Sequence, residues 1–242
     1  MKNSDMAVYE FHTRVGYDDI DQDLSLNLRG VMGMMQEAAI LHSDLTGFSI
    51  RNVQQTHVIW MLIQWRIRIV KKAFWNEAVT VRTWPRTMGR ATSARDFEVV
   101  DVCGERIAIG ESLWVLVNAD TGRITRVTQQ MRDLYHLTQE TVFETPVFPV
   151  ADMCGSQTYS AVVSRRDIDT NRHVNNRVYL DYAREALPSH IDISEFSEVS
   201  IHFHKQLLLG QRFCCQYIAE QSRHIVRIVS DDGVLHAVMA FQ

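Results

Sequence analysis

The chain has 242 residues, of which 46% are hydrophobic and 22% are charged. These proportions are ordinary for a globular protein and exclude disorder as the default expectation. The formal net charge is −4, from 25 basic and 29 acidic side chains, which excludes the broad cationic field that non-specific nucleic-acid binding needs. The N-terminus has no apolar signal segment, and every apolar stretch is interrupted before the roughly 18 residues of a membrane span. We therefore expect a cytoplasmic protein with no membrane span and no nucleic-acid partner.

The first predicted helix follows Asn27, whose side chain can cap the free N–H groups of a first helical turn. Apolar residues then recur at i, i+3, i+4 and i+7, which is the stripe of a helix that packs on one face. These residues are Val31, Met34, Met35 and Ala38.

Strands are predicted after this helix. Residues 57–69 alternate between apolar side chains on one face and Gln64, Arg66 and Arg68 on the other. A period of two over this length indicates a half-buried antiparallel strand. Further strands are predicted at 78–83, 94–100 and 106–117, followed by a turn-rich connector with a short amphipathic segment near 131–137.

The second part of the chain repeats the first. Asp-Ile-Asp at 19–21 recurs at 167–169, an offset of 148 residues. A repeat of this kind predicts two copies of one structural unit. Further residues that match at this offset without a gap are Val15 with Val163, Glu37 with Glu185, and Ala38 with Ala186.

A second helix is predicted after the second Asp-Ile-Asp. Asn175 or Asn176 can cap it, and Pro188 ends it. Strands are then predicted at 199–204, 212–218, 225–229 and 234–241.

Each half therefore reads as a strand, a long helix and an antiparallel meander. This order predicts an α+β fold, a tandem (double) hotdog in which each half is an antiparallel sheet wrapped around a long central helix. We expect an N-terminal hotdog at 1–125, a connector at 126–155, and a C-terminal hotdog at 156–242.

The start of the second copy holds side chains suited to acid–base chemistry. Asp169 is a candidate base or nucleophile, His173 can polarise a substrate group or exchange protons near neutral pH, and Asn171 can orient its neighbours. The free N–H groups of the following helix start could stabilise an oxyanion. The first copy has Asp21, Asp23 and Ser25 at the matching positions. It lacks the imidazole, so we expect one active site, in the C-terminal half.

This region resembles the D-x-N-x-H-V-N-N run of plant and bacterial acyl-ACP thioesterases, where the run opens the helix of the C-terminal hotdog. The matching residues are Asp169, Asn171, His173, Val174, Asn175 and Asn176. The N-terminal half also resembles that family at Met35–Ala39, Trp60, Thr83–Arg86, Arg95–Phe97 and Ser112–Val115. The resemblance implies hydrolysis of fatty acyl-ACP, which releases the free fatty acid and ends chain elongation, with no metal or organic cofactor. It also implies that the C-terminal hotdog is the catalytic half and that the N-terminal hotdog shapes the acyl pocket.

One position departs from the family pattern. Members carry a glutamate after a basic pair in the following strand, and plant members carry a cysteine beside it. Here Gln206 and Leu207 stand at these two positions, which excludes a cysteine mechanism there. Gln206 can hydrogen-bond a water but cannot take up its proton. We therefore expect Asp169 to act as the only base, with Gln206 as the fourth residue of the site.

Several other residues are candidates for substrate binding. Met34, Met35 and Trp60 could line the acyl pocket, although methionines at helical spacing could equally be core. Two basic groups could meet the acidic surface and phosphopantetheine phosphate of the acyl carrier protein, although solvated side chains are the plainer interpretation. They are Arg165, Arg166 and Arg172 in the second copy, and Arg66, Arg68, Lys71 and Lys72 in the first.

Two alternative functions stay open at this point. An acyl-CoA thioesterase would differ in the carrier of the acyl group, and an acyl-binding hotdog module without hydrolysis is made plausible by Gln206. The oligomeric state is also open, because a duplicated hotdog already contains the helix-to-helix pairing that single hotdogs form between chains. A monomer or a homodimer is compatible with the sequence.

Overall fold

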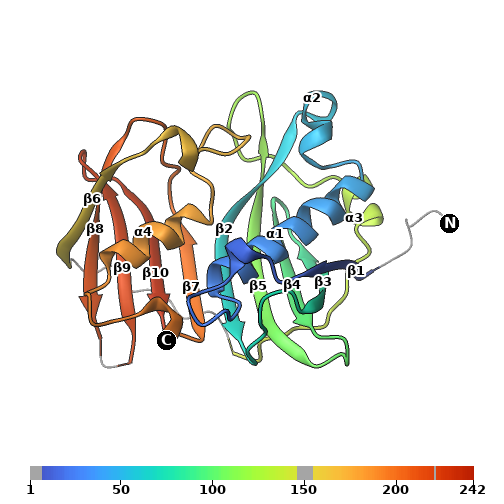
Figure 1. The fold of residues 1–242 in the computed structure, drawn as a ribbon. Coiled ribbons are helices and arrows are strands. Elements are labelled where there is room, and N and C mark those ends of the chain that lie inside the picture. The colour runs from blue at the N-terminus through green and yellow to red at the C-terminus, as the bar shows by residue number, and fades with distance from the viewer. Residues whose placement is uncertain (1–6, 146–154, 221) are drawn as a thin grey trace. The chain divides into compact units, whose positions relative to one another are not determined.

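The computed structural model describes residues 7–145, 155–220 and 222–242 (Figure 1). By contact, the chain divides into two compact units, residues 1–146 and 147–242. Within the described ranges, no helix is both long and apolar enough to cross a membrane.

The first unit is a five-stranded antiparallel sheet with a long helix against it (Figure 1). The strand order is β1-β3-β4-β5-β2, and α1 packs against the first four strands of the chain. The elements are β1 (Tyr9–Arg14), α1 (Leu28–Leu45), α2 (Val53–Thr56), β2 (Val58–Ile69), β3 (Ala78–Met88), β4 (Thr92–Val100), β5 (Arg106–Asn118) and α3 (Gln129–Leu134), with short 3-10 turns at Tyr17–Asp19 and Ile50–Asn52.

The second unit repeats this arrangement with the strand order β7-β10-β9-β8-β6. Its helix packs against β6 and β8. The elements are β6 (Ser156–Val162), α4 (Val178–Ala186), β7 (Glu198–Phe203), β8 (Arg212–Ala219), β9 (His224–Ser230) and β10 (Leu235–Phe241), with 3-10 turns at Arg165–Asp167 and Ile193–Glu195. Each unit thus has the strand, helix and meander order that the sequence predicts.

The helix α1 forms where its sequence predicts it. The side chain of Asn27 accepts a hydrogen bond from the N–H of Gly30 over 2.8 Å, which satisfies one free donor of the first turn. The residues of the apolar stripe are buried, and Met35 is 0% exposed. A Cβ added to Gly110 would lie 2.6 Å from the sulfur of Met35, so a larger residue at position 110 would clash with the helix. Glycine in β5 therefore lets the helix lie close to the sheet.

The second helix begins later than predicted. Asn175 and Asn176 form a turn, and α4 starts at Val178. The Asn175 side chain still accepts from a backbone N–H of this turn, that of Arg177, over 3.0 Å. At the other end the helix stops at Leu187, before Pro188, as predicted.

The strand β2 departs from strict alternation. Its pairing with β5 shifts register between Leu62 and Gln64, and such a bulge turns the following side chains relative to the earlier ones. Arg66 lies beyond the bulge and is only 1% exposed, because a later segment of the chain covers it. Its Nη1 donates to the carbonyl of Thr145 over 2.9 Å, and Phe143 lies over the guanidinium at 4.1 Å. The expectation that Arg66 shares a solvated polar face is therefore wrong.

The segment 126–135, which we expected in the connector, packs on the first unit. The helix α3 is capped by Thr128, whose hydroxyl accepts from the N–H of Met131 over 3.2 Å. Arg132 then donates to the carbonyl of Met88 over 2.7 Å. A core cluster joins this segment to the sheet, and its buried members are Met88, Leu116, Val127, Met131 and Tyr135.

Candidate functional site

The motif of the second unit forms one tight turn. The N–H of Asp169 donates to the carbonyl of His173 over 2.9 Å, and the N–H of Arg172 donates back to the carbonyl of Asp169 over 3.0 Å. The carboxylate of Asp169 accepts from the N–H of Asn171 over 2.8 Å. Arg172 occupies the left-handed region at a φ of 64°, which closes the turn. The backbone therefore holds the three predicted catalytic side chains within five consecutive residues.

The first unit contains the same turn without the same side chains. The N–H of Asp21 donates to the carbonyl of Ser25 over 2.9 Å, and Leu24 has a φ of 65°. Both turns are also closed by a single antiparallel bridge, Ile20 with Leu26 and Ile168 with Val174. All these residue pairs are related by the offset of 148 residues that the sequence shows.

Gln206 lies on the segment that runs beside the motif turn. The N–H of Val174 donates to the carbonyl of Leu207 over 3.0 Å, and in the first unit Leu26 donates in the same way to Ala73 over 2.8 Å. By this match, Gln206 corresponds to Lys72. The Nζ of Lys72 lies 2.7 Å from Oδ2 of Asp23.

The two matching positions in the second unit are Asn171 and Gln206. In the first unit they are Asp23 and Lys72, and these two side chains form an ion pair. By this internal comparison, the segment of Gln206 lies beside the motif turn. The first copy differs at two of the matching positions, where Asp23 pairs with Lys72 and Ser25 replaces the imidazole.

The motif turn is only partly open to solvent. Asp169 and His173 are half-buried, and Asn171 is exposed. Desolvation lowers the pKa of His173, against the opposing effect of the nearby Asp169 carboxylate. The imidazole is therefore neutral at neutral pH and can both accept and donate a hydrogen bond.

Most backbone donors at the start of α4 are already used. The N–H groups of Asn175, Arg177 and Val178 donate to oxygens of Asp167 and Asn175. These three N–H groups are therefore not free to bind an oxyanion, and the expected oxyanion site stays a prediction for the other donors of this helix start.

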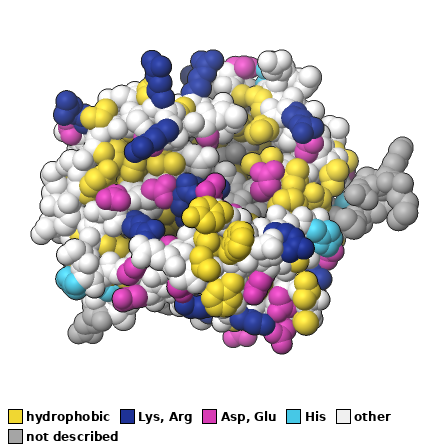
Figure 2. Space-filling view, in the orientation of Figure 1, with side chains coloured by type: hydrophobic (Ala, Val, Ile, Leu, Met, Phe, Trp, Pro, Cys, Tyr) yellow, Lys and Arg dark blue, Asp and Glu magenta, His cyan; other side chains and the backbone are white. Residues whose placement is uncertain are grey.

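The predicted arginines surround the motif turn and are exposed. Arg165, Arg166 and Arg172 all reach solvent, and the Arg166 side chain is 91% exposed at 3.7 Å from the carboxylate of Asp167. On the face shown in Figure 2, basic side chains are scattered among acidic ones. These three arginines are free to meet an anionic partner, which the buried Arg66 is not.

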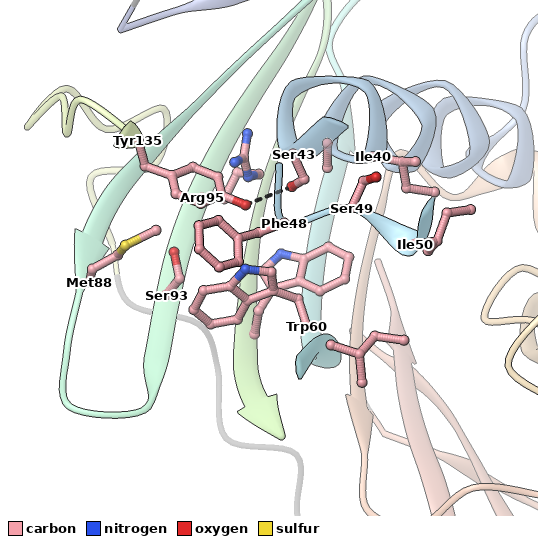
Figure 3. A pocket seen from close by; sticks show the side chains of 13 residues that line it. Ile40, Ser43, Phe48, Ser49, Ile50, Trp60, Met88, Ser93, Arg95 and Tyr135 are labelled. Carbon is pink, nitrogen blue, oxygen red and sulfur yellow. Dashed lines mark hydrogen bonds between the residues drawn. The ribbon is translucent and has the colours of Figure 1, made fainter. Parts of the chain in front are cut away.

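A pocket lies in the first unit, between the second half of α1, the loop that follows it, and strands β2 to β5 (Figure 3). Its cavity volume is about 70 Å³. Apolar side chains line much of it, among them Ile40, Phe48 and Trp60, but so do three serines, Tyr135 and Arg95. Of the predicted acyl-binding residues, Trp60 lines this pocket, whereas Met34 and Met35 are buried elsewhere in the core.

The sequence assigned no individual role to Arg95 or Tyr179. Arg95 alternates along β4 with Phe97 and Val99, so the three side chains point to the same face of the sheet, and the latter two are fully buried. Strict alternation could therefore have placed Arg95 under α1. Tyr179 is 2% exposed, and its hydroxyl accepts from the N–H of Leu207 over 3.1 Å. Nothing in the local sequence indicates that contact. Across the described ranges, no group of three His, Cys, Asp or Glu side chains could hold a metal ion.

Known proteins resemble this chain over nearly all of its length. The family model of the acyl-ACP thioesterase N-terminal domain matches residues 6–135, and that of the acyl-ACP thioesterase C-terminal domain matches residues 154–239. The oleoyl-acyl carrier protein thioesterase 2, chloroplastic, of Arabidopsis thaliana is 29% identical over 195 residues, which cover 73% of this chain and 53% of the relative. The palmitoyl-acyl carrier protein thioesterase, chloroplastic, of Cuphea hookeriana is 23% identical over 205 residues, which cover 78% of this chain and 49% of the relative. The chain thus spans about half the length of these curated relatives.

Two solved structures share the fold of the whole chain. An acyl-ACP thioesterase from Bacteroides thetaiotaomicron superposes with a TM-score of 0.86 at 17% identity and covers 97% of both chains. The 12:0-ACP thioesterase from Umbellularia californica gives a TM-score of 0.83 at 19% identity, covering 98% of this chain and 97% of its own. These similarities confirm the double hotdog fold. With both family models matched in order along one chain, the protein belongs to the acyl-ACP thioesterase family.

Proposed function

We propose that the protein hydrolyses the thioester of fatty acyl-ACP, which releases the free fatty acid and ends elongation of the chain. The observation that carries this proposal is the motif turn of the second unit. It holds Asp169, Asn171 and His173 beside the segment of Gln206. The matching turn of the first unit has an ion pair and a serine instead.

In the proposed reaction, Asp169 takes a proton from a water molecule as the water oxygen attacks the thioester carbon. One of its carboxylate oxygens already accepts from Asn171, and the other is available to the water. Gln206 orients this water through its amide. The carbon–sulfur bond then breaks, and the released thiolate takes the proton that Asp169 removed from the water, which regenerates the Asp169 carboxylate and gives a fatty acid and a thiol.

Neutral His173 and the amide of Asn171 are proposed to hydrogen-bond the thioester carbonyl as negative charge develops on its oxygen. No metal or organic cofactor takes part in this scheme. The exposed Arg165, Arg166 and Arg172 are proposed to bind the acidic carrier protein and its phosphopantetheine phosphate.

The test compares two matched substitutions. Asp169→Asn removes the base within its turn, and Asp21→Asn makes the same change in the equivalent turn of the first unit. We expect Asp169→Asn to lower kcat by at least about 100-fold, because a positioned acid–base group contributes about 10²–10⁴-fold. Asp21→Asn should change it by less than about twofold.

Fatty-acid release would be measured with one acyl group on carrier protein and on CoA, and folding would be checked by circular dichroism. Normal hydrolysis by Asp169→Asn would show that the site is wrong. Equal or better turnover of the CoA substrate by the unsubstituted protein would instead favour an acyl-CoA thioesterase. If no fatty acid is released from either carrier, the result would favour an acyl-binding module without hydrolysis.

A further inference from the structure

His236 is a buried residue of β10 whose ring is hydrogen-bonded at both nitrogens. The residue is 1% exposed. Its Nδ1 donates to the backbone carbonyl of Lys205 over 2.9 Å, since a carbonyl oxygen can only accept. Its Nε2 is hydrogen-bonded to the hydroxyl of Ser230 over 2.8 Å. Because Lys205 directly precedes Gln206, the imidazole reaches the segment that carries the fourth residue of the candidate site.

A β-bulge brings His236 to this position. The pairing of β10 with β9 shifts register between Leu235 and Ala237, so that His236 is an extra residue in β10. A bulge of this kind re-aims a side chain. The carbonyl of His236 also accepts from the N–H groups of His204 over 2.8 Å and of Lys205 over 3.3 Å. Residue 236 therefore holds the end of the neighbouring strand β7 with its backbone as well as with its ring (Figure 1).

The first unit contains the same bulge with an isoleucine in it. The pairing of β5 with β4 skips Ile107, which is the extra residue there. The carbonyl of Ile107 accepts from the N–H groups of Val70 over 2.8 Å and of Lys71 over 3.1 Å, in the pattern that His236 shows. Ile107 is likewise 1% exposed. The two residues are therefore equivalent in the two copies.

This equivalence separates the bulge from the imidazole. An apolar residue forms the same bulge in the first unit, so the fold does not require a histidine at position 236. A buried polar ring is destabilising unless its hydrogen bonds are satisfied, and an isoleucine avoids that requirement. The imidazole adds one contact that isoleucine lacks, the hydrogen bond to the carbonyl of Lys205.

The bond to Lys205 holds one side of Gln206, and α4 holds the other. The N–H of Leu207 donates to the hydroxyl of Tyr179 over 3.1 Å. Gln206 thus lies between two anchored residues. An amide side chain acts only through the placement of its hydrogen bonds, and a displacement of about 1 Å can lower a rate by about 100-fold.

We propose that His236 is a positioning residue, which holds the backbone of Lys205 so that the amide of Gln206 is directed at the attacking water. The inference rests on the proposed function, since it takes Gln206 to orient that water. His236 is buried and acts through Gln206, not on the substrate.

The first test gives the second unit the residue of the first. We expect His236→Ile to lower kcat for dodecanoyl-ACP by about tenfold or more at unchanged KM, because Gln206 loses its placement. In a Gln206→Ala background, the same substitution should change kcat by less than about twofold, because no amide is left to position. A structural role would lower kcat equally in both backgrounds.

The matched control is Ile107→Val in the bulge of the first unit. It removes one buried carbon from the equivalent position, so it should lower the temperature of thermal unfolding slightly and leave kcat within about twofold.

Two polar substitutions separate the hydrogen bond from the packing of the ring. His236→Asn places an amide nitrogen as many bonds from the backbone as Nδ1, so it can still donate to the carbonyl of Lys205. His236→Gln places its nitrogen one bond farther out, level with Nε2. We expect His236→Asn to keep most of kcat and His236→Gln to lose it. This comparison decides the question even if His236→Ile does not fold.

Full kcat in His236→Ile, an equal loss with and without Gln206, or equal kcat in the Asn and Gln variants would each overturn the inference. Hydrolysis by the unsubstituted protein would then still support the proposed function. Absence of hydrolysis by the unsubstituted protein would overturn both.

Discussion

Single residues decide how the motif turn is completed. The backbone of Leu207 is bonded on both sides, since its carbonyl accepts from Val174 and its N–H donates to the hydroxyl of Tyr179. Desolvation raises the pKa of Tyr179 to about 12, so the phenol stays protonated. Its helix thereby positions the segment of Gln206. This matters because an amide at position 206 can act only through the placement of its hydrogen bonds.

Tyr179→Phe should show whether Tyr179 positions the segment of Gln206 for the reaction or only stabilises the fold. The substitution leaves the N–H of Leu207 without its acceptor, which costs about 1–3 kcal/mol of stability. We also expect kcat to fall by about tenfold at unchanged KM, because small displacements of catalytic groups are expensive. Steady-state kinetics and thermal unfolding would measure both effects.

The matched control for this substitution is Tyr217→Phe. It removes a hydroxyl that bonds His224 over 2.7 Å, and it should leave kcat unchanged. A loss of stability in Tyr179→Phe with full kcat would show that Tyr179 supports the fold alone.

At the scale of elements, α1 carries a buried histidine into the core of the first unit. His42 is 4% exposed and stacks on Tyr9 with ring centroids 5.6 Å apart. Tyr135 meets it edge-on at 5.8 Å. The positive charges that face it are Arg95 and His136, and both disfavour its protonation. Protonation of His42 would therefore oppose the packing of this helix.

The stability of the first unit should fall in mild acid because of His42. Its folded pKa of about 3 lies below the ordinary value of about 6.5, so the unfolded chain binds the proton first. The stabilisation is fully present above pH 6.5 and is lost progressively as the pH falls toward 3, by roughly 1 kcal/mol per pH unit. Urea unfolding at several pH values would measure this slope.

His42→Gln provides the comparison. It keeps an acceptor for Arg95 but cannot be charged, so its stability should depend less steeply on pH in this window. The same slope in both proteins would mean that other groups cause the acid sensitivity.

The whole molecule uses one element order twice for different purposes. In the second unit the turn before the helix carries the proposed catalytic groups, and in the first unit the equivalent turn is closed by an ion pair. The described pocket belongs to the first unit. Under the proposed function, substitutions in the first unit should change the choice of acyl chain, and substitutions in the second unit should change the rate of hydrolysis.

Ala39→Leu should alter the choice of acyl chain without altering the chemistry. Ala39 lines the pocket from α1, and leucine is a good helix former that would fill part of the space. The added carbons cost about 1–3 kcal/mol if the core cannot adjust. We expect KM to rise most for the longest chains that the protein hydrolyses, with kcat for the shortest chains preserved. Assays over a series of chain lengths would show this, in contrast to Asp169→Asn, which should lower kcat at every length. A uniform loss in Ala39→Leu would contradict this division between the units.

Much of the fold follows from local sequence. The cap at Asn27, the stripe through Met35 and the stop before Pro188 each depend on neighbours within a few residues, and the structure has all three. The repeat was readable for the same reason, because the backbone turn at Asp169 needs only a short run of residues to form. The motif itself located the candidate site.

Tertiary structure alone decided the features that depend on partners far along the chain. The segment 143–145 covers and buries Arg66, the packing of α1 and β4 forms the pocket around Arg95, and a tyrosine on α4 bonds the segment of Gln206. The sequence by itself determined which residues could form the site and which fold would carry them. It did not determine which polar groups are buried, because burial and the bonds that offset it are set when distant elements pack.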